Sequence, residues 1–189
     1  MPVREVLRYP HPALKRAAQE LGEDREDRRI AERVTGDLLD TLRAFPGCVG
    51  LAAPQVDEPV RIVVVDVSGH PKAVEPHGLL LLVNPRVVRS QGSEIAREGC
   101  LSIPDLTANV RRATTIGVEA LSPAGDAVAI DARGFEARCL QHEIDHLDGI
   151  LFLDRVASLT ADVFPRRRGR PQPGPPAPDR GEGPPPGGA

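Results

Sequence analysis

The chain has 189 residues, of which 24 are basic and 27 acidic, giving a formal net charge of −3. This mildly acidic balance argues against a general nucleic-acid binder, and against a specific DNA binder as well. No apolar run is long enough for a membrane span, and the N-terminus lacks the pattern of a signal peptide, so we expect a cytoplasmic location. The three cysteines show no framework spacing, which argues against a disulfide scaffold.

The first strong periodicity predicts a helix. Ile30, Val34, Leu38 and Leu42 recur every fourth residue, which indicates an amphipathic helix over residues 25–43. A Pro-Gly pair at 46–47 ends it.

Short aliphatic segments predict strands along most of the remaining chain. They are residues 61–67, 78–83, 87–90, 95–101, 115–120 and 127–130. Asn84-Pro85 and the segment 122–126 predict turns between them. A second helix is expected from Gly134 to Asp148-Gly149, followed by a short packed segment at 151–153. Strands outnumber helices and come in runs, so we expect an α+β fold with mostly antiparallel sheet.

The composition changes near Phe164. Residues 165–189 contain nine Pro and six Gly and no aliphatic residue larger than Ala, which predicts a disordered tail after a domain at 1–164. Four arginines between 166 and 170 open this tail. They form either a solvated spacer or a weak contact with RNA, such as the ribosome surface.

The most informative motif is His142-Glu143-Ile144-Asp145-His146. On a helix its two histidines lie about 40° apart around the axis, so both imidazoles can bind one divalent metal. Glu143 would project beside that metal and could transfer protons. The alternative is a surface helix that carries two histidines and an acid by chance.

A catalytic metal site also needs a third protein ligand. Downstream of the motif only Asp148 and Asp154 are available before the predicted tail. Upstream, Cys100 ends a strand-like run, and its thiolate would be a strong ligand. Cys100 could instead be a buried structural cysteine, and Cys139 and Cys48 are weaker candidates.

Three motifs together resemble the peptide deformylase family: G-L-A-A-P-Q, E-G-C-L-S and Q-H-E-I-D-H-L-D-G. Their order and approximate spacing match, and the resemblance spans residues 6–155. It implies antiparallel sheets around a central helix that carries the HExxH motif. It also implies that the protein removes the formyl group from formyl-methionyl nascent polypeptides. The usual form in the family is a monomer. The implied cofactor is one divalent metal ion. In the family this ion is usually Fe²⁺, and Zn²⁺, Ni²⁺ or Co²⁺ can replace it.

The resemblance also assigns residue roles. The implied metal ligands are Cys100, His142 and His146. The implied catalytic groups are Glu143 as acid and base, with the Gln55 side chain and the Leu101 N–H as oxyanion donors. The implied substrate-binding residues are Gly50 for the peptide backbone and, around the methionine side chain, Val49, Glu98, Phe135, Arg138 and Cys139.

The chain departs from the family pattern at four positions. Cys48 and Asp57 each replace a frequent glycine, and Asp57 should cost little unless its position needs φ > 0. Thr107 stands where many members have an arginine near the substrate path. Arg138 is unexpected in an apolar pocket, although its stem could pack while its charge reaches solvent.

Two other functions are open to a chain with these motifs. An HExxH metalloprotease would need a further His or Glu ligand, and no good candidate follows the motif. A domain that binds metal or peptide without turnover would be favoured by an altered Gln55, Glu143 or ligand residue, and all are intact.

Overall fold

The computed structural model describes residues 3–166. Its helices are α1 (Arg25–Ala44) and α2 (Gly134–Leu147), with short 3-10 turns η1 (Pro12–Lys15), η2 (Ala53–Val56) and η3 (Phe152–Arg155). Its strands are β1 (Gly50–Ala52), β2 (Ile62–Val65), β3 (Leu80–Gln91), β4 (Glu94–Cys100), β5 (Ile103–Arg112), β6 (Thr115–Leu121), β7 (Ala127–Arg133) and β8 (Val163–Pro165).

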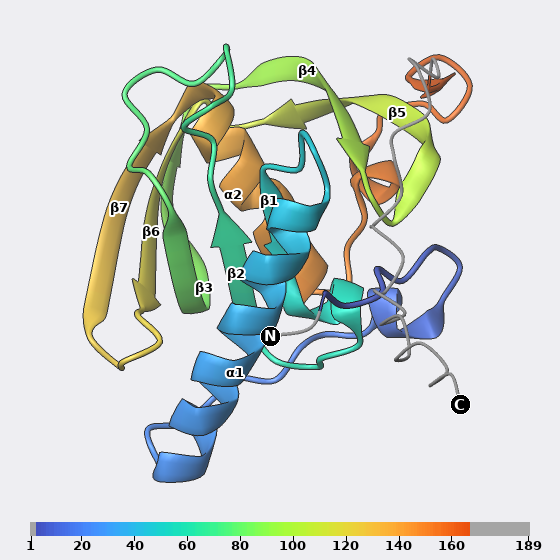
Figure 1. Cartoon of the computed structure of the whole chain (residues 1–189). Helices are drawn as coiled ribbons and strands as arrows, with labels where there is room; N and C mark the ends of the chain where they lie inside the picture. Colours follow the sequence, from blue (N-terminus) through green and yellow to red (C-terminus); the bar gives the residue numbers. More distant parts are fainter. Residues whose placement is uncertain (1–2, 167–189) are drawn as a thin grey trace, which may run out of the picture.

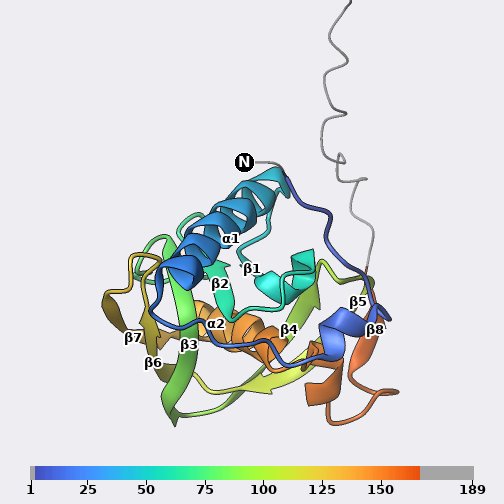
Figure 2. The ribbon, with the colours of Figure 1, turned by 90° about the horizontal axis from the view of Figure 1, so that it is seen from below.

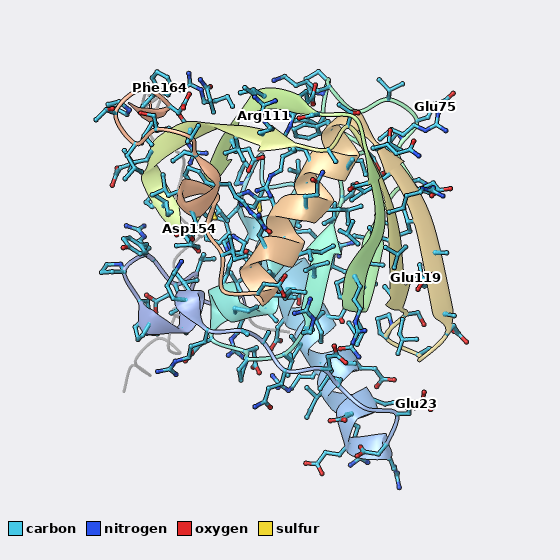
Figure 3. All side chains as sticks on the ribbon, turned by 180° about the vertical axis from the view of Figure 1, so that it is seen from behind. Glu23, Glu75, Arg111, Glu119, Asp154 and Phe164 are labelled. Atoms are coloured by element: carbon cyan, nitrogen blue, oxygen red, sulfur yellow. The ribbon has the colours of Figure 1, made fainter. Side chains whose placement is uncertain are left out.

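The strands form two antiparallel sheets with α2 between them (Figures 1 and 3). The larger sheet has the order β1-β2-β3-β6-β7, and the smaller has the order β4-β5-β8. Strands β1 and β4 are therefore terminal strands of their sheets. The predicted α+β class, with antiparallel sheets around a central helix, is confirmed.

The larger sheet is covered on both faces near β2. Figure 2 shows β2 between α1 and α2. Val63 and Val65 pack in the cluster that includes α2, whereas Ile62 and Val64 pack in the cluster that includes α1. All four residues of β2 are buried, which explains why its sequence is a continuous aliphatic run and does not alternate.

Helix α1 follows its predicted bounds closely. Asp24 caps its first turn, since its carboxylate accepts hydrogen bonds from the backbone N–H groups of Glu26 (2.8 Å) and Asp27 (2.9 Å). Val34, Leu38 and Leu42 are buried against β2, as the four-residue period predicts.

Helix α2 carries the HExxH motif through the core; it starts at the predicted Gly134 and ends at Leu147, just before the predicted Asp148-Gly149. Gly134 has φ +53° and Gly149 has φ +69°, a region that favours glycine. A side chain at Gly149 would also meet the backbone of Lys15 at 2.8 Å. The end of α2 is therefore set by close chain packing as well as by backbone conformation.

One predicted turn is wrong. Asn84-Pro85 lies inside β3, where it makes an irregularity in the pairing with β6 and joins two segments that were expected as separate strands. Asn84 adopts φ +51° and its side-chain amide exchanges hydrogen bonds with the backbone of Leu21, at 3.0 and 2.8 Å. This contact with a distant segment stabilises the bulge.

The sequence analysis also missed β1, β5 and β8. Strand β8 pairs with β5 and includes Pro165, and Arg166 N–H donates to Asp105 C=O, so the described fold continues two residues past the predicted boundary. The rest of the predicted tail lies outside the described residues. Among residues 3–166, no helix combines the length and apolar character needed to cross a membrane.

Candidate active site

A buried cysteine and two histidines meet where β4 ends beside α2. Cys100, His142 and His146 place one ligand atom each within 4.8 Å of one another, and Cys100 Sγ lies 3.3 Å from His146 Nε2. Burial works to raise the pKa of the Cys100 thiol, but the histidines lower it well below its usual value. This environment favours the thiolate, which is the form that binds metal.

Glu98 orients one of these histidines. Its carboxylate lies 2.9 Å from His142 Nδ1, which leaves Nε2 of the same ring directed to Cys100 and His146. Arg112 holds the carboxylate with two hydrogen bonds, at 2.9 and 3.1 Å. Although burial opposes it, these partners lower the pKa of Glu98 to about 2, so the group stays ionised. Sequence analysis did not assign this role to Glu98 and did not single out Arg112.

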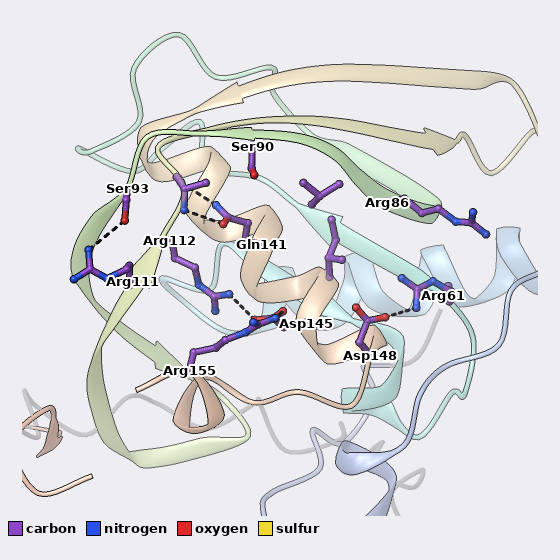
Figure 4. Close-up of a pocket in the computed structure, with 13 residues that line it drawn as sticks. Arg61, Arg86, Ser90, Ser93, Arg111, Arg112, Gln141, Asp145, Asp148 and Arg155 are labelled. Atoms are coloured by element: carbon purple, nitrogen blue, oxygen red, sulfur yellow. Dashed lines mark hydrogen bonds and ion pairs between the residues drawn. The ribbon is translucent and has the colours of Figure 1, made fainter. Parts of the chain in front are cut away.

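The support continues around α2 to the neighbouring residue Asp145. Arg112 also donates to Asp145, the fourth residue of the HExxH motif, and Arg155 donates to both Asp145 oxygens (Figure 4). These groups line a cavity of about 580 Å³ that also includes Gln141 and Asp148. The cavity lies behind the metal-ligand face of α2, so it belongs to the supporting network and not to the reaction site.

Gln55 reaches the same centre from η2. Its Oε1 accepts the Ala52 N–H at 2.9 Å, which fixes the amide so that Nε2 points inward. Nε2 donates to Cys100 Sγ (3.3 Å) and to Ser102 Oγ (3.1 Å). Leu101 and Ser102 form the turn between β4 and β5, so the Leu101 N–H directly follows Cys100 in the chain while the Gln55 amide contacts the Cys100 thiol.

Glu143 is buried next to Gly50. Its Oε2 has no hydrogen-bond partner among residues 3–166, and burial raises its pKa to about 7 despite the nearby histidines. A Cβ on Gly50 would lie 2.5 Å from Glu143 Oε1 and 2.9 Å from Cys139 Sγ. Glycine at position 50 therefore leaves the space that the Glu143 carboxylate occupies.

The three ligand residues fit one divalent metal ion. One thiolate and two imidazole nitrogens suit Zn²⁺ and several other transition metals, and a fourth position can remain open for water or substrate. The Glu143 carboxylate interacts electrostatically with all three ligand residues, and its Oε2 has no partner among residues 3–166, which suits a group that exchanges protons with a bound ligand.

Comparisons with known proteins identify the family. A family model described as polypeptide deformylase matches residues 3–162. The chain is 40% identical over 169 residues to the peptide deformylase of Rhizobium meliloti, covering 88% of this chain and 92% of that protein. It is also 40% identical over 164 residues to that of Halothermothrix orenii, covering 87% and 100%. The chain belongs to the peptide deformylase family.

Solved structures agree with this assignment. A Met-Ala-Ser-bound class I type b peptide deformylase from Acinetobacter baumannii matches with a TM-score of 0.75 and 30% identity, covering 82% of this chain and all of that one. The chain is therefore a hydrolase that removes the N-terminal formyl group from nascent polypeptides. The family is metal-dependent, and the Cys100, His142 and His146 group agrees with that dependence.

Of the residues expected around the methionine side chain, Phe135, Arg138 and Cys139 lie on the N-terminal half of α2, whereas Val49 precedes β1 and Glu98 lies in β4. Cys139 Sγ is 3.6 Å from Val49 C=O, and Phe135 stacks on His70 with ring centroids 3.9 Å apart. Arg138 is nearly buried one helical turn before His142 and pairs with Glu94 of β4. The stem of Arg138 packs inside as expected, but its charge does not reach solvent: the side chain is 10% exposed and the guanidinium pairs with the half-exposed carboxylate of Glu94.

The other departures from the family pattern have local consequences. Asp57 has φ +62°, so its position does require the left-handed region and a frequent glycine there is explained. Cys48 Sγ lies 3.1 Å from Gly50 C=O, and burial raises its pKa to about 12, which makes this thiol a poor nucleophile. Thr107 accepts a hydrogen bond from Arg97 of β4 at 3.2 Å.

Proposed function

We propose that this deformylase uses Cys100, His142 and His146 as its metal ligands and Glu143 as its catalytic acid and base. The observation that carries the proposal is the meeting of these groups in one buried centre, with Glu143 raised to a pKa of about 7. A proton carrier works best when its pKa is close to the working pH.

A divalent ion held by these ligands supplies the Lewis acidity that makes water a nucleophile near neutral pH. Glu143 accepts a proton from the attacking water and returns it to the leaving amine. The Gln55 amide and the Leu101 N–H hold the oxygen of the attacked formyl group as it gains negative charge. One such donor contributes about 3–4 kcal/mol to transition-state stabilisation.

The peptide is proposed to bind between β1 and β4, each a terminal strand of its sheet. Gly50 and its neighbour Val49 offer backbone groups from β1, and an extended peptide can pair with such an edge. Its methionine side chain would lie over Phe135, Arg138 and Cys139. Glu98 supports this site by orienting His142 through its contact with Nδ1.

The small size of the formyl group gives the selectivity. Its carbon carries only hydrogen, so a narrow site beside buried Glu143 and Gln55 can admit it and exclude bulkier acyl groups. We therefore propose that acetylated peptides and internal peptide bonds are poor substrates.

We propose Fe²⁺ as the ion used in the cell, by resemblance to the family, while the same donor set also accepts Zn²⁺, Ni²⁺ or Co²⁺. By resemblance to the family we further propose that the enzyme is a monomer, and we propose a cytoplasmic location because its substrates are nascent chains. We also propose that the arginine run at 166–170 makes a weak contact with ribosomal RNA. Light scattering tests the monomer, and salt-dependent cosedimentation with ribosomes tests the RNA contact.

The central test uses protein prepared without oxygen and loaded with Fe²⁺. Formate release is measured from formyl-Met-Ala-Ser, its acetylated analogue and an internal peptide, and only the first should react. The Glu143→Ala variant should keep its metal content and lose about 100- to 10,000-fold in turnover. Near-normal turnover by this variant would remove Glu143 from the reaction.

A further inference from the structure

Two arginines gather on the outer face of the small sheet, beside the candidate site. Along β4, Glu98 and Cys100 point inward and are buried, whereas Arg97 is exposed on the opposite face. Side chains of successive strand residues alternate between faces, so Gly99 shares the outer face with Arg97. Gly99, the outer-face residue nearest the site, therefore directly precedes the proposed ligand Cys100.

The last described strand brings the second arginine to this place. Phe164 of β8 pairs with Thr107, which in turn pairs with Gly99. The Arg97 guanidinium lies 3.6 Å over the Phe164 ring and donates to Thr107 Oγ1. These two contacts are with uncharged groups and do not neutralise its charge.

Arg166 follows β8 and lies over Gly99. A Cβ on Gly99 would be 2.6 Å from Arg166 Nη2, so the guanidinium occupies the space where other residues carry a side chain. Both positive charges are thus held on the same face of β4, next to the point where β4 meets the metal-ligand residues.

An extended peptide would present alternate side chains to this face. Strand β4 is terminal in its sheet, so its outer edge can pair with a peptide whose formyl group lies at Cys100. If the methionine side chain turns inward over α2, the side chain of the second residue turns outward, because strand side chains alternate. The second side chain then lies beside Gly99, Arg97 and Arg166.

We propose that Arg97 and Arg166 make the second residue of the substrate a point of selection and favour aspartate or glutamate there. This inference rests on the proposed peptide orientation in the site. Each solvent-accessible ion pair contributes little, so the two together should give a preference of about three- to tenfold.

The test compares kcat/KM for formyl-Met-Asp-Ser and formyl-Met-Asn-Ser, both amidated at the C-terminus so that they differ only in the second side chain. The enzyme should prefer the aspartate peptide about three- to tenfold at low salt, and less as salt rises. In Arg97→Gln and Arg166→Gln the ratio should fall, and in the double variant it should approach one.

Arg89→Gln is the matched control. Arg89 is an exposed arginine of β3 in the larger sheet and pairs there with Asp131 of β7. Its substitution changes the net charge equally and should leave the ratio as it is. Arg97→Lys keeps the charge and should retain part of the preference. A wild-type ratio near one, or an equal fall in the Arg89→Gln control, would overturn the proposal.

Binding of the amidated products Met-Asp-Ser and Met-Asn-Ser, measured by calorimetry, separates this inference from the proposed mechanism. The aspartate product should bind more tightly to the metal-loaded enzyme even if catalysis follows a different route. Equal binding of the two products together with normal turnover would overturn the second-residue preference alone. Preferential binding without formate release would overturn the proposed catalytic roles alone.

Discussion

The contact between Gly50 and Glu143 makes the sharpest prediction. In Gly50→Ala the new methyl group would lie 2.5 Å from Glu143 Oε1 and 2.8 Å from its Cγ, where ordinary contacts begin at 3.4 Å. The carboxylate must therefore retreat by about 1 Å, and a misplacement of this size costs about 100-fold in rate. The loss should appear in kcat, because the displaced group transfers protons.

The assay is steady-state formate release with metal content measured on the same samples. Gly69→Ala is the control, since a Cβ there meets nothing within 4 Å. In a Glu143→Ala background, Gly50→Ala should cost less than in the wild type, because the displaced carboxylate is gone and only the 2.9 Å contact with Cys139 Sγ remains. A loss confined to KM, with kcat retained, would refute the steric reasoning and leave Gly50 as a substrate contact only.

The remaining predictions concern ligation, support and backbone strain. Cys100→Ser should sharply reduce metal content by elemental analysis; unchanged content would remove the thiolate from the ligand set. Glu98→Gln should weaken metal binding about 10- to 100-fold in a chelator competition, because His142 loses its orienting carboxylate, and equal affinity would contradict that role. The same change removes one of the two buried carboxylates that pair with Arg112, leaving Asp145, and should lower the free energy of unfolding by about 1.5–3 kcal/mol in urea titrations. Asp57→Gly should raise the free energy of unfolding by about 0.5–1 kcal/mol, because glycine adopts the left-handed conformation at position 57 without strain. A lower urea midpoint for this variant would argue against strain there.

Periodicity predicted the elements that depend on local patterns. Helix α1 could be read from apolar residues at every fourth position, and α2 from its motif and flanking glycines. Strand β5 was missed because its sequence mixes Pro104, Asp105 and Asn109 with aliphatic residues. It forms because β4 and β8 pair with it on both sides, which no window of local sequence contains.

The sequence alone named the residues proposed for the chemistry of the site, since Cys100, Gln55 and the HExxH residues stand in three recognisable motifs. Only the tertiary structure decided how they are supported. Glu98 contacts His142 across 44 residues of sequence, and Gly50 makes room for Glu143 because β1 packs directly against α2. Such contacts depend on strand pairing and on the packing of α2 between two sheets. These long-range arrangements are fixed by burial of the whole core, so no single motif reveals them.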